Sequence, residues 1–269
     1  MAKKDSIAVW EKQMAEQAEV AAKMEAGVGG GQFFKLQGGT LSFGGAPMPD
    51  NRMAVIILGS ILENVHYEGA YDPESNTGPD CFAFGTTEEE MIPHKDVVDP
   101  VHPTCTGCPN NQWGTADRGK GKACRNTRRL AVIPAGILDK AGDFEAFENA
   151  GDLESEPIAY LKLPITSVRG YATMVKQVAG VFKRPPHGVF TKVEVIPDEK
   201  TQFKVVFETL GKVPNKLLSL VMERHAEAVE AIDFPYTPPD DDDVKPQKRK
   251  KNVKKAAAKK PARKARRKF

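Results

Sequence analysis

All four cysteines of this 269-residue chain lie within one 44-residue stretch, and their spacing constrains how that stretch can fold. Cys105 and Cys108 form a C-x2-C knuckle, which lets two thiolates reach one tetrahedral metal ion. Cys124 follows the knuckle after fifteen residues, close to the gap between the two halves of a zinc ribbon. Cys81 is the obvious fourth ligand, reached across a long loop. The spacing therefore predicts one zinc ion held by Cys81, Cys105, Cys108 and Cys124.

Two histidines and a different cysteine chemistry remain as alternatives for this stretch. His102 lies three residues before Cys105 and would complete a site of three cysteines and one histidine, and His94 is a weaker candidate. Two disulfides or free thiols are the other alternative, although disulfides are rare in reducing compartments. A closed site with four protein ligands leaves no position for a reactive water, so the zinc is expected to be structural.

The residues around Cys124 are strongly basic. Between residues 105 and 135 there is one acid, Asp117, against six basic residues: Arg118, Lys120, Lys122, Arg125, Arg128 and Arg129. Trp113 lies in the same loop. Cations beside an exposed ring suit a sugar-phosphate backbone with stacked bases, whereas the alternative is a solvated surface with Trp113 packed over the knuckle.

Charge divides the chain into an acidic body and a basic end. Residues 245–269 contain fourteen lysines and arginines and no acid, which leaves 25 basic against 36 acidic residues elsewhere, a net charge of −11. We expect residues 238–269, including the four aspartates at 240–243, to be a disordered tail.

At the other end, residues 1–26 have the apolar spacing of an amphipathic helix, and residues 27–31 form a glycine-rich linker. That helix could pack on its own domain or mediate self-association.

Residues 32–237 are expected to form one mainly β domain with accessory helices. Strands are predicted at 33–43, 52–62, 129–133, 157–164, 189–196 and 202–208, with helices at 167–182 and 215–232, the latter capped by Asn215. A helix between the third and fourth strands is the order of a five-stranded OB-like barrel, here with the zinc knuckle inserted at about 80–125. The longest aliphatic run, Met53 to Leu58, is far too short to cross a membrane.

Several motifs together resemble a group of phage and prophage single-stranded DNA-binding proteins. They are Pro79-Asp80-Cys81, Cys105-x2-Cys108-Pro109-x3-Trp113-Gly114, Gly119-Lys120-Gly121-Lys122-Ala123-Cys124, Arg128-Arg129-Leu130 and Leu163-Pro164-Ile165-Thr166-Ser167. The resemblance covers roughly residues 32–210 and implies an OB-type domain with a zinc knuckle. The helix-destabilising protein of T-even phages is a more distant analogue. That analogue has a histidine among its zinc ligands, whereas this chain has Cys81 at the fourth position. Phage single-strand binders also often end in an acidic tail, whereas this chain ends in a basic one.

These observations predict a sequence-tolerant single-stranded DNA-binding protein of phage DNA replication or recombination, acting in the bacterial cytoplasm without catalysis. The expected contacts are the six basic residues and Trp113, with stacking also on Phe34, Tyr67 or Tyr71. Replication or recombination proteins are candidate partners. A nonspecific duplex or nucleoid binder driven by the tail, and a zinc-ribbon adaptor for a polymerase, are the competing hypotheses.

Overall fold

The computed structural model of this protein describes residues 33–68, 78–117, 119–147 and 149–236, together with the helical positions Trp10, Met14 and Gln17. The predicted glycine linker and tail, and the predicted contacts Arg118 and Tyr71, lie outside these residues. Of the predicted N-terminal helix only the three positions named are described, and Trp10 and Met14 are exposed there.

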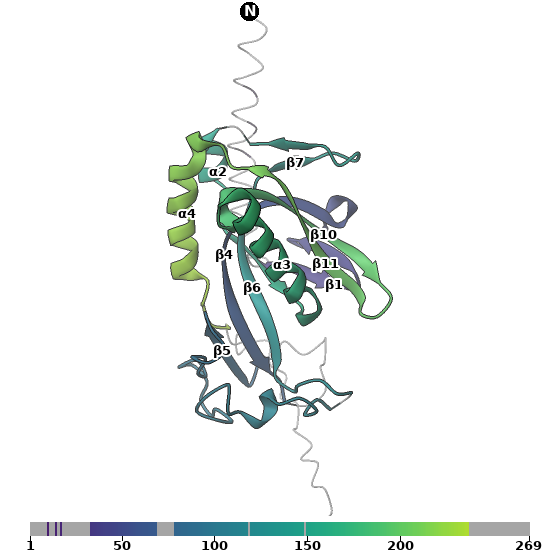
Figure 1. Ribbon diagram of the computed structural model, residues 1–269, viewed down its shortest axis with the longest axis vertical. Helices are drawn as coiled ribbons and strands as arrows, with labels where there is room; N and C mark the ends of the chain where they lie inside the picture. Colours follow the sequence, from purple (N-terminus) through teal and green to yellow (C-terminus); the bar gives the residue numbers. More distant parts are fainter. Residues whose placement is uncertain are drawn as a thin grey trace, which may run out of the picture.

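A single nine-stranded sheet organises the described chain (Figure 1). Its order is β11-β10-β4-β6-β9-β1-β2-β3, and β5 also pairs with β4. Every pairing is antiparallel except that of β1 with β9. The strands are β1 Phe33–Gln37, β2 Thr40–Phe43, β3 Ala46–Pro47, β4 Arg52–His66, β5 Cys81–Gly85, β6 Arg125–Pro134, β9 Ala159–Leu163, β10 Val189–Asp198 and β11 Gln202–Lys212; β7 Gly136–Leu138 and β8 Phe144–Ala146 form a separate hairpin.

Helices cover both faces of the sheet. The helix α3, Ile165–Phe182, packs on one face, and α4, Leu218–Ala231, packs on the other together with the short α2, Ala150–Glu154. We call these the α3 face and the α4 face. Four 3₁₀ turns complete the described structure: η1 Pro49–Asn51, η2 Pro109–Asn111, η3 Pro186–Gly188 and η4 Asn215–Leu217. In the described part of the chain, no helix has the length and apolar character needed to cross a membrane.

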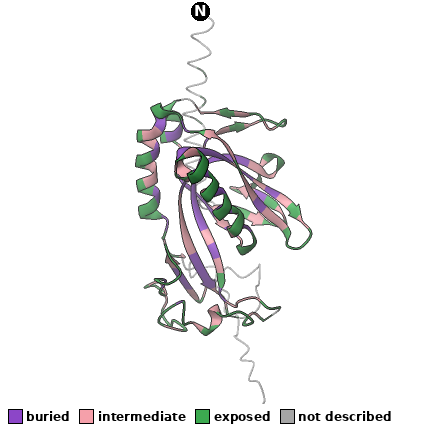
Figure 2. Ribbon diagram, in the orientation of Figure 1, coloured by how far each residue is buried: buried purple, intermediate pink, exposed green. Residues whose placement is uncertain are grey.

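The strand β4 explains why the sheet can be covered on both sides. Side chains alternate between the faces of a strand, so Val55 and Ile57 enter the core under α3, whereas Ile56 and Leu58 enter the core under α4. All six residues of the run Met53 to Leu58 are consequently buried, as the purple stretch of the central strands in Figure 2 shows. A continuous apolar run in a short segment thus marks a strand that is buried on both faces.

The sheet is open and curled. Its path runs from β11 to β3 without a pairing between those ends. The turn between β1 and β2 nevertheless approaches β11, because a Cβ added to Gly39 would lie 3.8 Å from that of Phe203. Side chains from both ends, Phe43 and Phe203 among them, pack into the core under α3.

The prediction of a mainly β fold with accessory helices is confirmed, and several element boundaries differ. The strand predicted at 33–43 is a hairpin, since Gly38 and Gly39 have φ values of 59° and 82° and turn the chain. Asn215 is not the cap of the last helix: it lies in η4, and its Oδ1 accepts a hydrogen bond from Arg184 at 3.2 Å. β5 and the β7–β8 hairpin were not predicted.

A buried ion pair ties the end of the described chain to the sheet. Arg129 Nη2 lies 2.6 Å from Glu63 Oε1, and both side chains are 1% exposed. Arg129 Nη1 donates to the carbonyl oxygens of Ile232 and Phe234, each at 2.9 Å. Burial opposes ionisation of Glu63, but Lys162, Arg129 and the Tyr236 hydroxyl outweigh it and hold the pKa of Glu63 below its ordinary value.

Arg129→Met should lower the free energy of unfolding by about 3 kcal/mol, because it leaves the buried Glu63 without its arginine partner, although Lys162, Tyr236 and Thr127 still contact the carboxylate. Denaturant unfolding measures this loss. The matched control is Arg169→Met on the exposed side of α3, which should change stability by no more than about 0.5 kcal/mol. Equal effects of the two substitutions would show that the ion pair does not hold the fold.

Two histidines far apart in the sequence are stacked between η3 and α4. The rings of His187 and His225 lie 4.1 Å apart, and His225 Nδ1–H donates to the Leu58 carbonyl at 2.6 Å. Burial and the neighbouring His225 lower the pKa of His187 to about 4. The buried or edge role expected for His225, as opposed to a general base, fits this contact.

The lowered pKa of His187 predicts acid sensitivity. The unfolded chain binds a proton at His187 near pH 6.5 and the folded chain only near pH 4, so this contribution to stability is complete above pH 6.5 and is lost as the pH falls toward 4. Unfolding free energies of the wild type and of His187→Phe, measured across that range, should show a shallower decline in the variant. Parallel declines would contradict this assignment.

Candidate metal and nucleic-acid site

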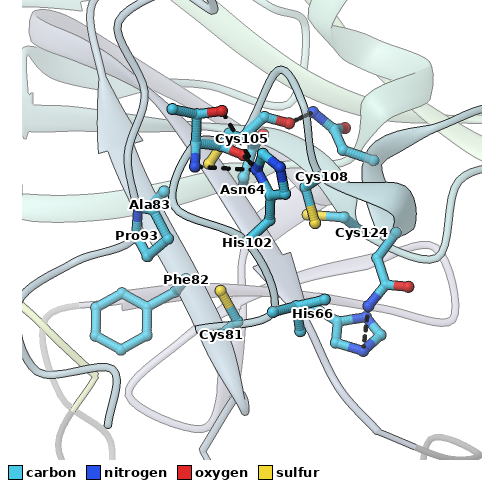
Figure 3. Close-up of a pocket in the computed structure, with 14 residues that line it drawn as sticks. Asn64, His66, Cys81, Phe82, Ala83, Pro93, His102, Cys105, Cys108 and Cys124 are labelled. Carbon is cyan, nitrogen blue, oxygen red and sulfur yellow. Dashed lines mark hydrogen bonds between the residues drawn. The ribbon is translucent and has the colours of Figure 1, made fainter. Parts of the chain in front are cut away.

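The four cysteines converge at one end of the sheet. Cys81 begins β5, Cys124 immediately precedes β6, and Cys105 and Cys108 belong to the long connection between these strands. All four line one pocket, which Figure 3 shows together with Asn64, His66 and His102. The four cysteines named from the sequence thus line the same pocket, and their binding of zinc stays a prediction.

Backbone contacts fix the knuckle against the rest of the connection. The Cys105 amide donates to Met91 O at 3.0 Å, and the Cys124 amide donates to Asn110 O at 2.7 Å. The Asn111 side chain donates to Cys105 O at 2.8 Å. Gly107 is required here by space, since a Cβ on it would lie 2.5 Å from the His102 ring.

The four side chains are free thiols. Burial, followed by the proximity of the other cysteines, raises the pKa of Cys124 to about 12. Burial also raises the pKa of Cys81 and of Cys105, with smaller contributions from neighbouring thiols. Neutral thiols are therefore favoured in the absence of a cation, and several thiolates would need a positive ion between them.

The donor set suits zinc, which prefers thiolate and imidazole ligands. Among the described residues, however, no three histidine, cysteine or acidic side chains already have their ligating atoms at metal-binding positions.

His66 is a pocket residue that the sequence reasoning missed. It lies directly opposite Cys81 in the β4–β5 pairing, so both side chains point to the α3 face. Its Nε2 is 3.1 Å from the Asn110 amide, and its Nδ1 is buried without a partner. A buried ring nitrogen without a partner is costly, so His66 is a further candidate ligand for an ion in this pocket. The only sequence signal was its position fifteen residues before Cys81.

The two histidines considered from the sequence lie differently. His102 lines the pocket, with Nδ1 2.9 Å from the Thr104 carbonyl oxygen. His94 instead stacks on Phe82 with ring centroids 5.0 Å apart, and its Nδ1 is 3.6 Å from Asp96. Phe82 points to the α4 face and contacts Tyr236, so His94 belongs to a different cluster from the thiols.

The alternation of β6 separates the predicted basic contacts. Arg128 lies on the α3 face, where it contacts Tyr171 of α3, whereas Arg125 and Arg129 lie on the α4 face. Arg129 is 1% exposed and bound to Glu63, so its predicted role in nucleic-acid contact does not fit the structure. Phe34, 8% exposed and packed on Phe43, is likewise too buried to stack on a base.

A polar strip runs along the α3 face from Arg128 to the knuckle. Asn126 Nδ2 donates to Asn64 Oδ1 at 2.5 Å and to Asn111 Oδ1 at 3.0 Å. Lys122 Nζ donates to the same Asn111 oxygen at 3.2 Å and lies 5.7 Å from the centre of the Trp113 ring.

Trp113 is 74% exposed, which excludes the packed position over the knuckle. Lys120 is exposed in the same loop, beside Gly119, whose φ of 79° turns the chain there.

Comparisons with known proteins found no match for this chain. No protein-family model matches the chain, and no curated protein or solved structure is significantly similar to it.

Cys108→Ser should abolish binding of one zinc ion per chain and loosen the connection between β5 and β6. Metal analysis of the purified protein together with limited proteolysis measures both effects, with Ala123→Ser as the control. Protein that contains no zinc and carries disulfide-bonded cysteines would contradict the assignment. In the same metal analysis, Cys81→Ser should lose zinc and His102→Ala should retain it. His66→Ala then shows whether the His66 imidazole contributes to zinc binding.

Proposed function

We propose that this protein is a sequence-tolerant single-stranded DNA-binding protein with one structural zinc ion, acting in phage replication or recombination. The DNA strand would lie on the α3 face, between α3 and the cysteine-bearing loops.

The main support for this proposal is the environment of the Arg128 side chain. Its guanidinium lies 5.6 Å from the Tyr171 ring and makes one long hydrogen bond, of 3.4 Å, to Ser60 Oγ. Its Nε is buried without a partner. Among the described residues it has no carboxylate within ion-pair distance, unlike Arg52, Arg129 and Arg224. A half-buried cation that lacks an acid is suited to bind an anion from outside, and DNA phosphate is such an anion.

The rest of the strip has the other properties that a single strand requires. Lys122 supplies a second cation at the far end, and the exposed Trp113 ring offers a stacking platform for any base. The amides of Asn64, Asn111 and Asn126 are mostly satisfied by each other. Such a surface would favour tolerance over base-specific recognition, because few donors remain to distinguish bases.

Zinc has a structural role in this proposal. It would hold the Trp113–Lys122 loop against β4, β5 and β6, so that the stacking ring and the cations keep their positions relative to Arg128. We also propose that the curled sheet is OB-like, since it is almost entirely antiparallel and the turn between β1 and β2 at one end approaches β11 at the other.

One observation favours a second candidate, the polymerase adaptor. Ile92, Val98 and Val101 are 61%, 98% and 48% exposed in the connection that leads into the knuckle. Exposed apolar side chains on one loop suit a protein partner. An adaptor would tolerate loss of Arg128 and Lys122, whereas a DNA-binding surface would not.

Lys122→Gln with Arg128→Gln should lower the affinity for single-stranded DNA by about tenfold or more, because two phosphate contacts are removed. The ratio of single-strand to duplex affinity is the decisive measurement, since the basic tail meets phosphates of either form. The control is Lys35→Gln with Lys140→Gln, two exposed lysines elsewhere. A ratio unchanged by the first pair would contradict the proposal.

A third variant in that experiment, Trp113→Ala, tests stacking. It should cost a further ~1–3 kcal/mol of binding free energy if the indole stacks on a base. Because Trp113 is exposed, the melting temperature of the Trp113→Ala protein should stay close to that of the wild type. A drop in melting temperature without an effect on binding at saturation would assign the ring to packing instead.

A further inference from the structure

One side chain, that of Asn111, connects the cysteine knuckle to the polar strip of the α3 face. Asn111 lies in η2, the turn that directly follows Cys108, and it lines the same pocket as the four cysteines. Its Nδ2 donates to the Cys105 carbonyl oxygen at 2.8 Å. Its Oδ1 accepts two hydrogen bonds, from Lys122 Nζ at 3.2 Å and from Asn126 Nδ2 at 3.0 Å. A single half-buried amide therefore contacts the knuckle on one side and the strip on the other.

The contacts of Asn126 extend this link along the sheet. Asn126 precedes Arg128 by two residues on β6, so both side chains lie on the α3 face. Asn126 Nδ2 also donates to Asn64 Oδ1 at 2.5 Å, and the Asn64 side chain forms a hydrogen bond with the side chain of Cys105. Cys105 is thus held through its carbonyl by Asn111 and through its side chain by Asn64. Because buried amides are costly to leave without partners, a movement of Cys105 would disturb all of these contacts.

Lys122 depends on this link for its position. An ammonium group has three donors, so Lys122 can keep its hydrogen bond to Asn111 and still donate to a phosphate. A lysine side chain that is free before binding loses rotamer freedom when it binds, and one that is already held loses less. Asn111 therefore prepares Lys122 for a phosphate for as long as Cys105 holds Asn111 in place.

We infer that Asn111 is a positioning residue through which the metal pocket and the DNA surface act on each other. When Cys105 is bound to zinc, its carbonyl oxygen has a fixed position, and Asn111 and Lys122 are fixed with it. Effects of two ligands on each other's affinity are reciprocal, so a DNA strand that holds Lys122 would also strengthen zinc binding. This inference rests on the proposed function, including its structural zinc, and adds that the two ligands are coupled through one side chain.

The test compares the zinc affinity of the full-length protein with and without single-stranded DNA. The protein competes with a chromophoric chelator for zinc, first alone and then with a saturating concentration of oligothymidine. The ordering of one long side chain corresponds to a severalfold change in affinity, so the DNA should raise the zinc affinity of the wild type by about threefold or more. The ratio of the two zinc affinities is the coupling.

Substitutions of two adjacent amides assign this coupling to a residue. Asn111→Ala removes the link between Cys105 and Lys122, so the ratio should fall close to one. The matched control is Gln112→Ala, because Gln112 Nε2 also donates to knuckle carbonyl oxygens, those of Thr106 at 3.2 Å and Cys108 at 3.4 Å, and neither bond reaches the strip. The control should keep the wild-type ratio. A purely structural role of Asn111 would lower zinc affinity equally with and without DNA and would leave the ratio unchanged.

A second variant, Asn111→Asp, keeps the test decisive if the alanine variant does not fold. Aspartate has the same shape and keeps an oxygen for Lys122, but it lacks the donor to Cys105, so the ratio should again fall close to one. Melting temperatures of all variants are measured alongside.

Each outcome separates the two proposals. A zinc affinity of the wild type that DNA does not change would overturn the coupling and leave the proposed function intact. The coupling through Asn111 would also be overturned by a wild-type ratio in the folded Asn111 variants, or by an equal loss of the ratio in Gln112→Ala. A protein that binds no single strand, or no zinc, would instead overturn the proposed function itself.

Discussion

Side chains along a β-strand alternate between the two faces of its sheet, and in this protein that alternation along β4 and β6 decides which of their polar side chains lie on the α3 face and which lie on the α4 face. The first half of β4 pairs with the second half of β6, and there both strands send apolar residues to both faces, under α3 and α4. In the other half the same alternation sends Asn64, His66 and Arg128 to one face and Glu63, Arg125 and Arg129 to the other. A slip of one residue in this pairing would exchange the two sets, so the fold and the site depend on the same register.

The bulge in β4 is what keeps that register consistent. The pairing with β6 shifts between Ile57 and Gly59, and Gly59 then faces α4, where an added Cβ would lie 3.7 Å from Ile232. From that point Arg129 points into the α4 face, where Glu63 neutralises it and four aromatic rings surround it. Arg128, one residue earlier, forms no ion pair with any of the acids in the described part of the chain, and its hydrogen bond is to Ser60. Two adjacent arginines with the same chemistry thus have opposite roles, one holding the fold and the other available to a ligand.

Much of this architecture could be predicted from the sequence, for physical reasons that differ by element. The apolar run Met53 to Leu58 and the spacing of Val168, Tyr171, Val175 and Val178 are local patterns, so β4 and α3 were predicted. The convergence of the four cysteines was predicted because metal-ligand spacing is local as well. The burial of Arg129 and Phe34 was not predictable in this way. Arg129 is buried because of partners more than 60 residues away in the sequence, such as Glu63. Phe34 is buried because of the packing of the curled sheet. His66 was missed because its relation to Cys81 exists only in the β4–β5 pairing.

The central claim is that a single strand of DNA lies on the α3 face between α3 and the knuckle. Ultraviolet cross-linking of a single-stranded oligonucleotide to the full-length protein, followed by mass spectrometry of the cross-linked peptides, tests it most directly. We expect cross-links at Trp113, in residues 119–128 and at the beginning of α3. Cross-links confined to residues 245–269, with none in the described domain, would contradict the claim and assign nucleic-acid binding to the basic segment alone.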